Sequence, residues 1–220
     1  MSKEIYLFNK LHKKTSRKYI DRVVDDKINC MIKSKEYGYD YWDGDRRFGY
    51  GGYKYDGRWK EIAKDLIAEY NLTNESKVLD VGCGKAFLLY EMKQLLPRIT
   101  IAGFDISSYA IQNAKDEIKD KLYIHKAQDK YDYADNEFDL VISLGTLHNL
   151  KIFDLKKAVQ EMQRVAKEKF IMVESYRNDE ELFNLECWAL TCESFFSPDE
   201  WTWLYGEWNY SGDYEFIYFE

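Results

Sequence analysis

The sequence predicts an α/β fold built on a mostly parallel sheet, and three observations support this prediction. From residue 78 onward, short apolar runs that suit buried strands alternate with runs that have the spacing of amphipathic helices. The first apolar run ends in a glycine turn, "DVGCGKAF", which leads directly into a helix. Because amphipathic helices separate the strands, we expect crossover connections and a parallel sheet with helices on both faces.

The expected elements follow one another in a regular order. Strands are predicted in "KVLDVG", "ITIAGFDIS", "LYIHKA", "FDLVISLG" and "KFIMVES". Helices are predicted in "KEIAKDLIAEYNL", "AFLLYEMKQLL", "SYAIQNAKDEIKDK" and "FDLKKAVQEMQRVA". The run "SPDEWTWLYG" predicts a short helix with Ser197 as N-cap and Pro198 at its first position. The final run, "EWNYSGDYEFIYFE", predicts a hairpin that turns at Ser211-Gly212 and adds at least one antiparallel strand.

Residues 1–56 are expected to form an N-terminal extension of helices and loop, and residues 57–220 the main domain. Residues 3–33 have the spacing of one or two amphipathic helices. Residues 35–59 are crowded with Gly and Tyr, which predicts either a surface loop packed on the domain or a lid over the active site. Basic residues gather in residues 1–35, as a solvated helix or as a lip that steers an anionic substrate.

Composition limits the class of protein. At 220 residues, with 45% apolar and 32% charged residues, the chain has the balance of a globular protein. No apolar run approaches the roughly 18 residues of a membrane-spanning helix, and the first residues lack a signal-peptide pattern. The formal charge of −7 argues against a general nucleic-acid binder. We expect a cytoplasmic protein with reduced thiols and no metal site, because Cys30, Cys83, Cys187 and Cys192 show no metal-binding spacing.

The glycine turn predicts a nucleotide site at the carboxyl ends of the strands, and its neighbours bear on which nucleotide binds. A dinucleotide fingerprint has a third glycine where this chain has Phe87. Asp80 precedes the first glycine and suits an ammonium group better than a diphosphate. Asp105, 21 residues after Gly84, can accept both ribose hydroxyls of either cofactor. Asp80, Phe87 and the expected hairpin favour a sulfonium cofactor, and a dehydrogenase becomes the least favoured alternative.

The segments "VLDVGCGKAFLL", "IAGFDISSYAIQNAK", "EFDLVISLGTLHNL" and "FIMVES" resemble, in order and spacing, the motifs of class I S-adenosylmethionine-dependent methyltransferases. The resemblance covers residues 57–220. It implies a Rossmann-like, seven-stranded, mostly parallel sheet with a reversed C-terminal hairpin, and S-adenosyl-L-methionine as cofactor. It also implies that Gly82 and Gly84 pass beneath the methionine part, that Asp80 helps hold its ammonium group, and that Asp105 binds the ribose.

One departure from the family pattern concerns the adenine. Many relatives carry an acid after the third strand, where this chain has Ala127 and Gln128, with Asp129 one step on. The adenine is therefore expected on backbone groups, on Gln128 or on a shifted Asp129. We expect Lys85, after the glycines, to be a solvated side chain rather than a contact. The cofactor set expected from the resemblance is Asp80, Gly82, Gly84, Asp105, Ile106, Gln128, Asp129 and Leu144.

At the reacting end, His148 after the fourth strand is the first candidate for a general base, because its ordinary pKa lies close to working pH. The alternative is a structural histidine that only lines the pocket, as in many relatives. Glu174, just past the fifth strand, is the second candidate base. Tyr53 and Arg58 of the Tyr/Gly segment, together with Tyr176, are expected to contact the acceptor.

The acceptor is expected to be a small molecule, anionic in one version. The run "FGYGGYKYDGRWK" resembles segments of small bacterial methyltransferases associated with cell-surface polysaccharide assembly. That resemblance implies methylation of an oxygen of a sugar, a nucleotide-sugar or a phosphorylated capsular precursor. Two alternatives stay open: a methyltransferase acting on protein or RNA, and a catalytically silent subunit that binds the cofactor and serves a partner. The sequence leaves the oligomeric state open.

Overall fold

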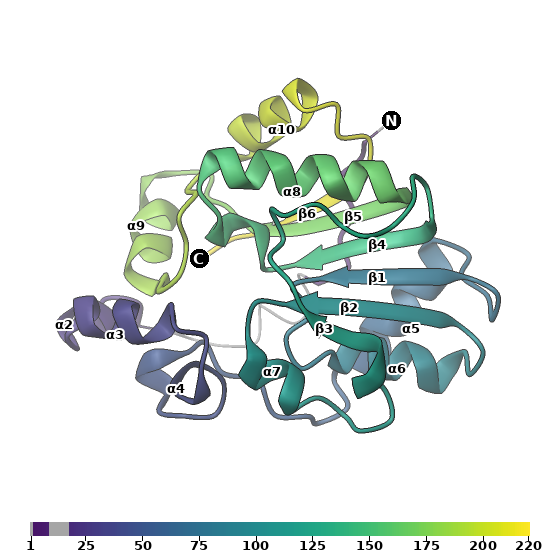
Figure 1. Ribbon diagram of the computed structural model, residues 1–220. Helices are drawn as coiled ribbons and strands as arrows, with labels where there is room; N and C mark the ends of the chain where they lie inside the picture. The colour runs from purple at the N-terminus through teal and green to yellow at the C-terminus, as the bar shows by residue number, and fades with distance from the viewer. Residues whose placement is uncertain (1, 9–17) are drawn as a thin grey trace.

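A parallel sheet of six strands with helices on both faces makes up the fold (Figure 1). The computed structural model describes residues 2–8 and 18–220, so residues 9–17 of the expected N-terminal helices, His12 among them, lie outside the described residues. Neighbouring strands pair in the order β3-β2-β1-β4-β5-β6. In chain order they are β1 (Lys77–Val81), β2 (Thr100–Asp105), β3 (Leu122–Ile124), β4 (Phe138–Leu144), β5 (Ala166–Glu174) and β6 (Asp213–Ile217).

The helices include all those expected between the strands. They are α2 (Asp21–Val24), α3 (Lys27–Ser34), α4 (Tyr39–Trp42), α5 (Trp59–Glu69), α6 (Phe87–Leu95), α7 (Ser108–Gln112), α8 (Ile152–Val165), α9 (Asp179–Trp188) and α10 (Pro198–Glu207). Short 3-10 turns are η1 (Arg46–Phe48), η2 (Lys119–Lys121) and η3 (Leu147–Asn149). Ser197 and Glu200 form the capping box that starts α10, as expected for a Ser-Pro start.

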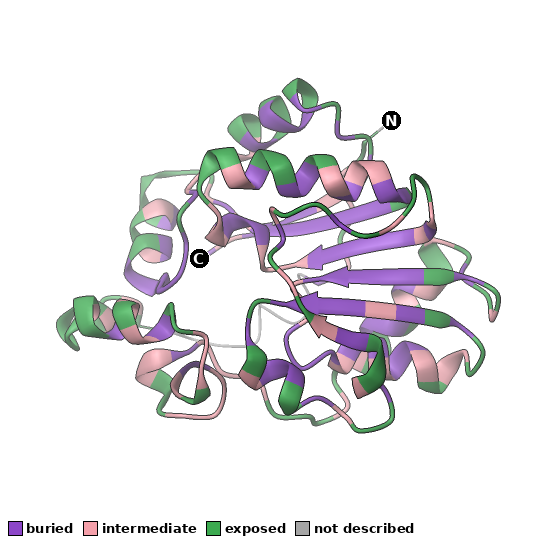
Figure 2. Ribbon diagram, viewed as in Figure 1, coloured by how far each residue is buried: buried purple, intermediate pink, exposed green. Residues whose placement is uncertain are grey.

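Alternate strand residues supply the two cores. In β1, Val78 packs into a cluster with residues of α5 and α6, whereas Leu79 packs into a cluster with residues of α8 and α10. The strands are therefore buried along most of their length, while the helices expose their outer faces (Figure 2). No helix among the described residues is long and apolar enough to span a membrane.

Two helices differ from the expectation. The helix expected over residues 108–121 ends at Gln112, because Asn113 closes it and its side chain donates to the Tyr109 carbonyl. The chain then turns so that Ile118 is buried in the core. Helix α9 was not predicted, although Asn178 caps it by accepting from the Glu181 N–H, a start signal that the sequence contains.

The expected seventh strand and antiparallel hairpin are wrong for the described chain. Residues 207–210 end α10 instead of forming a strand, since the Tyr210 N–H donates to the Tyr205 carbonyl. After α10 the chain enters β6, which pairs with β5 in parallel. On the other side of β6 lies the N-terminal segment, where Ile5 N–H donates to the Tyr214 carbonyl and Tyr214 N–H donates to that of Lys3.

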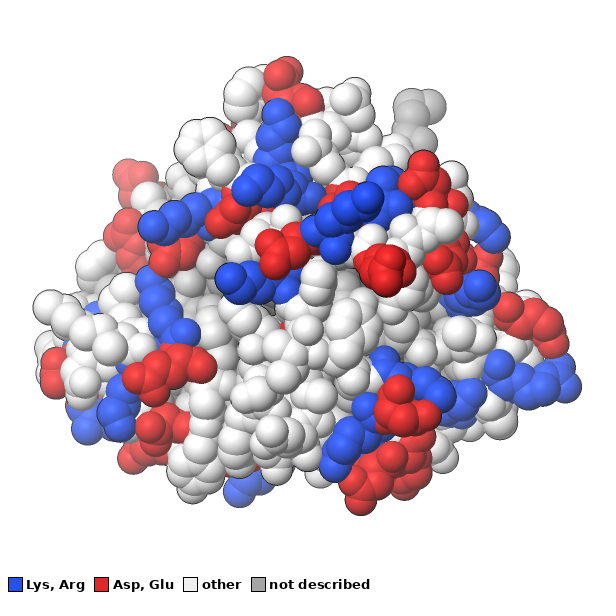
Figure 3. Space-filling view, in the orientation of Figure 1, with Lys and Arg blue, Asp and Glu red and all other residues white. Residues whose placement is uncertain are grey.

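All six strands point their carboxyl ends toward the same side, where α2, α3, α4 and α9 lie beyond the sheet (Figure 1). Residues 35–58 thereby reach the edge where open parallel sheets bind ligands. On the face shown in Figure 3, basic and acidic side chains of the described residues are interspersed rather than separated. The division of the chain at residue 56 stays a prediction.

Candidate functional site

Two adjoining cavities lie at the carboxyl ends of the central strands. The larger has a volume of about 480 Å³ and the smaller about 130 Å³. Residues common to both come from the Tyr/Gly segment, from the start of α5, from the glycine turn and from the end of β4. They are Trp42, Gly52, Tyr53, Trp59, Gly82 and Leu144.

The glycine turn after β1 forms a floor without side chains. Gly82 and Gly84 have φ angles of +78° and +55°, in the left-handed region that favours glycine. A Cβ on Gly82 would collide with the side chain of Thr146, which donates to the Gly82 carbonyl at 3.2 Å. A Cβ on Gly84 would lie 2.7 Å from the ring of Trp42. Only glycine therefore fits at either position.

Asp80 lines the smaller cavity and is 3% exposed. Its Oδ1 is buried and accepts no hydrogen bond from any residue that the structure describes. Burial, and then the negative charge of Asp105, raises the pKa of Asp80 to about 8. A buried carboxyl with an unsatisfied oxygen fits a cationic ligand such as an ammonium group, because a positive charge would stabilise the ionised form.

Asp105, at the end of β2, lines the larger cavity and ties two turns together. Its Oδ2 accepts from the Gly84 N–H at 2.9 Å, and its Oδ1 accepts from the Ser107 N–H at 2.8 Å. Burial raises the pKa of this carboxyl, and the two backbone N–H groups offset part of that rise. Because each carboxylate oxygen has a second lone pair, Asp105 can still accept hydrogen bonds from a ligand's hydroxyls.

Beyond Asp105, the larger cavity runs along the ends of β2 and β3. Ile106, Gln128 and Leu144 line it, as does Ala127. Asp129 is exposed and lines neither cavity, so the structure does not bring it into the site.

His125 also lines this part of the cavity, and its Nε2 is buried without a hydrogen-bond partner among the described residues. His125 lies near the end of the third predicted strand and was not among the residues predicted for the site. Its nearness to the expected adenine end was not foreseen.

Aromatic rings from outside the sheet form a wall of the larger cavity. Tyr41 stacks on Tyr53 with centroids 5.2 Å apart, and Tyr50 packs on Trp188 of α9 at 5.7 Å. Phe8 of the N-terminal segment packs on Trp59 at 6.3 Å. The aromatic residues lining this cavity outside the sheet are Phe8, Tyr37, Tyr41, Trp42, Tyr50, Tyr53, Trp59 and Trp188.

Lys85 anchors the Tyr/Gly segment, contrary to the expectation of a solvated side chain. It is 7% exposed, and its Nζ lies 2.7 Å from each carboxylate oxygen of Asp43. Tyr109 OH donates to the same carboxylate at 2.9 Å. Trp42 is fixed beside it, since its Nε1 donates to Ser107 Oγ at 2.8 Å. These contacts hold residues 37–53 over the glycine turn, and this segment is called the lid below.

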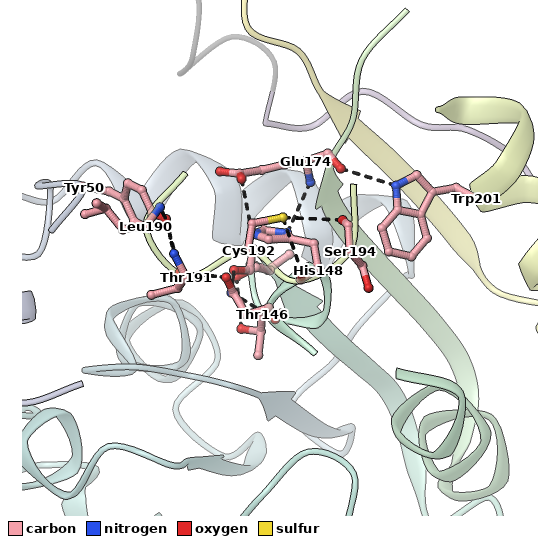
Figure 4. A network of polar contacts seen from close by, with 12 residues as sticks. Tyr50, Thr146, His148, Glu174, Leu190, Thr191, Cys192, Ser194 and Trp201 are labelled. Atoms are coloured by element: carbon pink, nitrogen blue, oxygen red, sulfur yellow. Dashed lines mark hydrogen bonds and ion pairs between the residues drawn. The ribbon is translucent and has the colours of Figure 1, made fainter. Parts of the chain in front are cut away.

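His148 and Glu174 both line the larger cavity, at the end where the acceptor is expected, and their side chains lie together (Figure 4). The Glu174 N–H donates to His148 Nδ1 at 3.3 Å, and His148 Nε2 lies 3.5 Å from Glu174 Oε2. Burial lowers the pKa of His148 to about 3, so the imidazole is neutral near pH 7. Since Nδ1 accepts a hydrogen bond, the single ring proton is on Nε2, the nitrogen that lies 3.5 Å from Glu174 Oε2.

The backbone around this pair is held by the segment after α9. His148 carbonyl accepts from the N–H groups of Glu193 and Ser194, and Trp201 Nε1 donates to the Glu174 carbonyl at 3.3 Å (Figure 4). Asn149, next to His148, is linked to Tyr50 through the side chain of Thr191. The 190–196 segment and Trp201 of α10 therefore fix the position of the pair.

Of the three residues predicted to contact the acceptor, two line a cavity and one does not. Tyr53 lines both cavities, and Arg58 lines the larger one. The guanidinium of Arg58 is engaged by Asp56, with its Nε 2.8 and 2.9 Å from the two carboxylate oxygens. Tyr176 lines neither cavity and packs against the core instead. The functions of all these residues stay predictions.

Comparison with known proteins identifies the family. The family model described as "Methyltransferase domain" matches residues 72–209. The demethylmenaquinone methyltransferase of Thermotoga maritima is 28% identical over 114 residues, 52% of this chain and 48% of that protein. The mitochondrial arginine-hydroxylase NDUFAF5 of Homo sapiens is 26% identical over 112 residues, 50% of this chain and 31% of that protein. The match spans about half or less of the length of these curated relatives.

Solved structures agree in fold. The YcgJ protein of Bacillus subtilis has a TM-score of 0.53 at 19% identity, with 66% of each chain covered. A complex of the Haloferax volcanii Trm112 methyltransferase activator with a methyltransferase gives a TM-score of 0.55 at 18% identity, covering 84% of this chain and 76% of that one. At these identities the likeness concerns the fold alone.

Proposed function

This chain belongs to the methyltransferase-domain family, whose model matches residues 72–209, and on that premise we propose that it is an S-adenosylmethionine-dependent methyltransferase acting on a small molecule. One observation carries the proposal. Asp80 is buried beside the side-chain-free glycine turn with an unsatisfied oxygen, in a cavity that adjoins a second, larger one. A ligand with an ammonium group at one end and a nucleoside at the other fits this arrangement.

The residues present fit the cofactor along its length. Asp80 would hold the ammonium group, Gly82 and Gly84 would let the methionyl chain lie on the backbone, and Asp105 would accept the ribose hydroxyls. Ile106 and Gln128 would border the adenine. When bound, the cofactor supplies a methyl group on a sulfonium, which is transferred to a nucleophile by in-line displacement.

The protein's own contribution is to position the acceptor and to remove its proton. We assign the role of general base, which takes the acceptor's proton, to Glu174. Its carboxylate lies at the end of the larger cavity where the acceptor is expected. His148 is assigned as a positioning residue, because Nδ1 is already used by a backbone N–H and Nε2 carries a proton. This reverses the order of the two candidate bases suggested by the sequence.

A small acceptor is supported by the lid. Residues 37–53 cover the glycine turn and supply most of the aromatic wall of the larger cavity, whose volume of about 480 Å³ is within the range of small-molecule sites. Stacked tyrosine and tryptophan faces suit a flat or ring-shaped acceptor, including the ring of a sugar. The relative from Thermotoga maritima is named as a methyltransferase of demethylmenaquinone, which is a small molecule.

Within small acceptors, an oxygen of a sugar or nucleotide-sugar remains our finer proposal. A phosphorylated capsular precursor is less favoured, since the guanidinium of Arg58, a predicted acceptor contact, is engaged by Asp56. A protein or RNA acceptor would require the lid to move aside. A silent subunit would not need a carboxylate and an imidazole joined at the end of the cavity.

Calorimetric titration with S-adenosylmethionine, S-adenosylhomocysteine and NAD, side by side, tests the cofactor. We expect binding in the micromolar range, on the order of −8 kcal/mol, for the first two and none for NAD. Binding of NAD alone would contradict the roles given to Asp80 and Asp105. A positive result licenses a methyl-transfer screen of neutral sugars against their phosphates, in which we expect the neutral members to be accepted.

A further inference from the structure

The smaller cavity contains one acid and one cation, Asp80 and Lys85, among the described residues that line it. Asp80 has an unsatisfied buried oxygen, and Lys85 is 7% exposed. An amino-acid end, with an ammonium and a carboxylate on one carbon, has the complementary pair of charges. The family motif explains the acid, but Lys85 has no role in the function proposed so far.

The hydrogen bonds of Lys85 leave one donor that can be redirected. Its Nζ is 2.7 Å from both Asp43 oxygens and 3.2 Å from the Tyr53 carbonyl, the longest of the three contacts. An ammonium has three protons, so the Tyr53 carbonyl is the partner that a stronger acceptor would replace. A carboxylate is such an acceptor, since charge-assisted hydrogen bonds are roughly twice as strong as neutral ones.

We propose that Lys85 binds the carboxylate of the cofactor's methionyl end, opposite Asp80, and that the same ammonium holds the lid closed over it. The inference rests on the proposed cofactor. Asp43 would keep its two contacts with Lys85, and the Tyr109 hydroxyl that donates to Asp43 offsets part of the repulsion between two carboxylates sharing one cation.

The position of the lid makes this arrangement a link between binding and closure. Asp43 follows α4, whose last residue, Trp42, packs on Gly84 where the methionyl chain would pass. Tyr53 lies at the other end of the same lid segment and lines both cavities. Lys85 therefore contacts the lid at two points, and a carboxylate bound to it would replace the Tyr53 carbonyl while the contact with Asp43 is kept.

The test compares two ligands that differ only in the carboxylate. Calorimetry measures the affinities of S-adenosylhomocysteine and of S-adenosyl-3-thiopropylamine, its decarboxylated analogue, for the full chain. The unaltered protein should prefer the first by about tenfold or more, the value of a hydrogen bond to a charged group. In Lys85→Met the preference should fall to near unity, because affinity for S-adenosylhomocysteine drops while that for the analogue is kept.

Two variants separate the ammonium from the lid. Asp43→Asn breaks the ion pair between Asp43 and Lys85, called the latch below, but leaves Lys85 in place. We expect this variant to keep the preference for the carboxylate. Lys64→Met, which removes an exposed ion pair on α5, is the matched control and should behave as the unaltered protein. A preference lost in both Asp43→Asn and Lys85→Met would overturn the proposal, because lid displacement alone would then explain it.

The remaining outcomes are also decisive. Equal affinity of the unaltered protein for the two ligands would overturn the proposal without any variant, which matters if Lys85→Met fails to fold. A full preference retained in Lys85→Met would remove Lys85 from the binding site while leaving the cofactor in place. Failure of both ligands to bind the unaltered protein would overturn the proposed function, and this inference with it.

Discussion

At the scale of the residue, burial decides the charge of the groups at the site. Asp80 and His148 are 3% and 2% exposed. Burial, with the charge of Asp105, raises the pKa of Asp80 to about 8, and burial lowers the pKa of His148 to about 3. Without a cation beside it, Asp80 is therefore protonated near pH 7, and His148 is neutral. A protonated Asp80 can ionise when a positively charged ligand binds beside it, and a neutral His148 can position other groups without carrying a charge.

The state of Asp80 predicts a stabilising substitution. Because its pKa is raised, its contribution to stability is fully present below the ordinary value of 3.8 and is lost as the pH rises through about 8. Asp80→Asn removes this loss, so its melting temperature without ligand should exceed that of the unaltered protein by on the order of 5 °C near pH 9, with a smaller gap near pH 6. Melting curves at the two pH values measure the difference in melting temperature between the two proteins. A difference that is the same at both pH values would contradict the raised pKa of Asp80.

The pair at the acceptor end predicts a division of roles. Glu174→Gln should lower kcat by about 10²-fold or more, with the affinity for S-adenosylhomocysteine kept, because it removes the proton acceptor. The pH dependence of kcat should show no inflection near 6.5 from His148, whose imidazole stays neutral down to about pH 3. Nitrogen-15 chemical shifts of the ring should report a bare Nδ1 and a protonated Nε2 near pH 6. Protonation of both nitrogens there would return His148 to the list of candidate bases.

At the scale of the element, the lid and the sheet edge show where sequence patterns stop being informative. The Gly- and Tyr-rich composition of residues 35–59 predicted a lid or wall, and the structure places part of this segment over the glycine turn. The latch was not predictable, because Asp43 and Lys85 are 42 residues apart and meet only when α4 lies on the turn. The residues around Lys85 have no local pattern that would show whether its side chain forms a buried ion pair or is exposed to solvent.

The predicted antiparallel hairpin at the edge of the sheet was wrong for a related reason. A run of alternating residues with Ser-Gly in the middle has the pattern of a hairpin, but α10 extends to Glu207 and the turn that ends it occupies residues 208–210. The partner of β6 is instead the segment around Ile5, from the far end of the chain. Glu215 of β6 fixes this segment by accepting from the N–H groups of Leu7 and Phe8. Such a long-range pairing has no signature within a window of residues.

This edge predicts a large stability effect from a residue near the N-terminus. Phe8 is 2% exposed and stacks on Phe170 of β5, with ring centroids 5.9 Å apart. Phe8→Ala should lower the free energy of unfolding by about 3–5 kcal/mol, since it empties a buried ring site. Tyr6→Ala, two positions earlier and 61% exposed, is the control and should change it by less than about 0.5 kcal/mol. Chemical denaturation measures both, and equal effects would place the segment outside the folded core.

At the scale of the whole molecule, the parts that the sequence predicted are those that depend on local periodicity and on one motif. Each of the five strands from "KVLDVG" to "KFIMVES" was placed, because buried parallel strands are short apolar runs between amphipathic helices. Cavities at the glycine turn and at the two acids lie where the sequence predicted a cofactor site, and the cofactor itself stays a proposal. At the other end of the larger cavity, residues 35–59 were predicted to form a wall, but the contribution of Phe8 could not be predicted, since only the tertiary fold brings the N-terminal segment to this cavity.

The coupling between these parts gives a prediction for the protein as a unit: cofactor binding should release a proton. An ammonium beside Asp80 favours its ionised form, while the protein alone holds a proton there below a pKa of about 8. Titration with S-adenosylhomocysteine in buffers of different ionisation enthalpy should therefore show close to one proton released near pH 7 and almost none near pH 9. The affinity should rise with pH over the same window and then level off. Asp80→Asn should bind more weakly and release no proton near pH 7. Release that persists in this variant would assign the proton to another group and would remove Asp80 from the ammonium site.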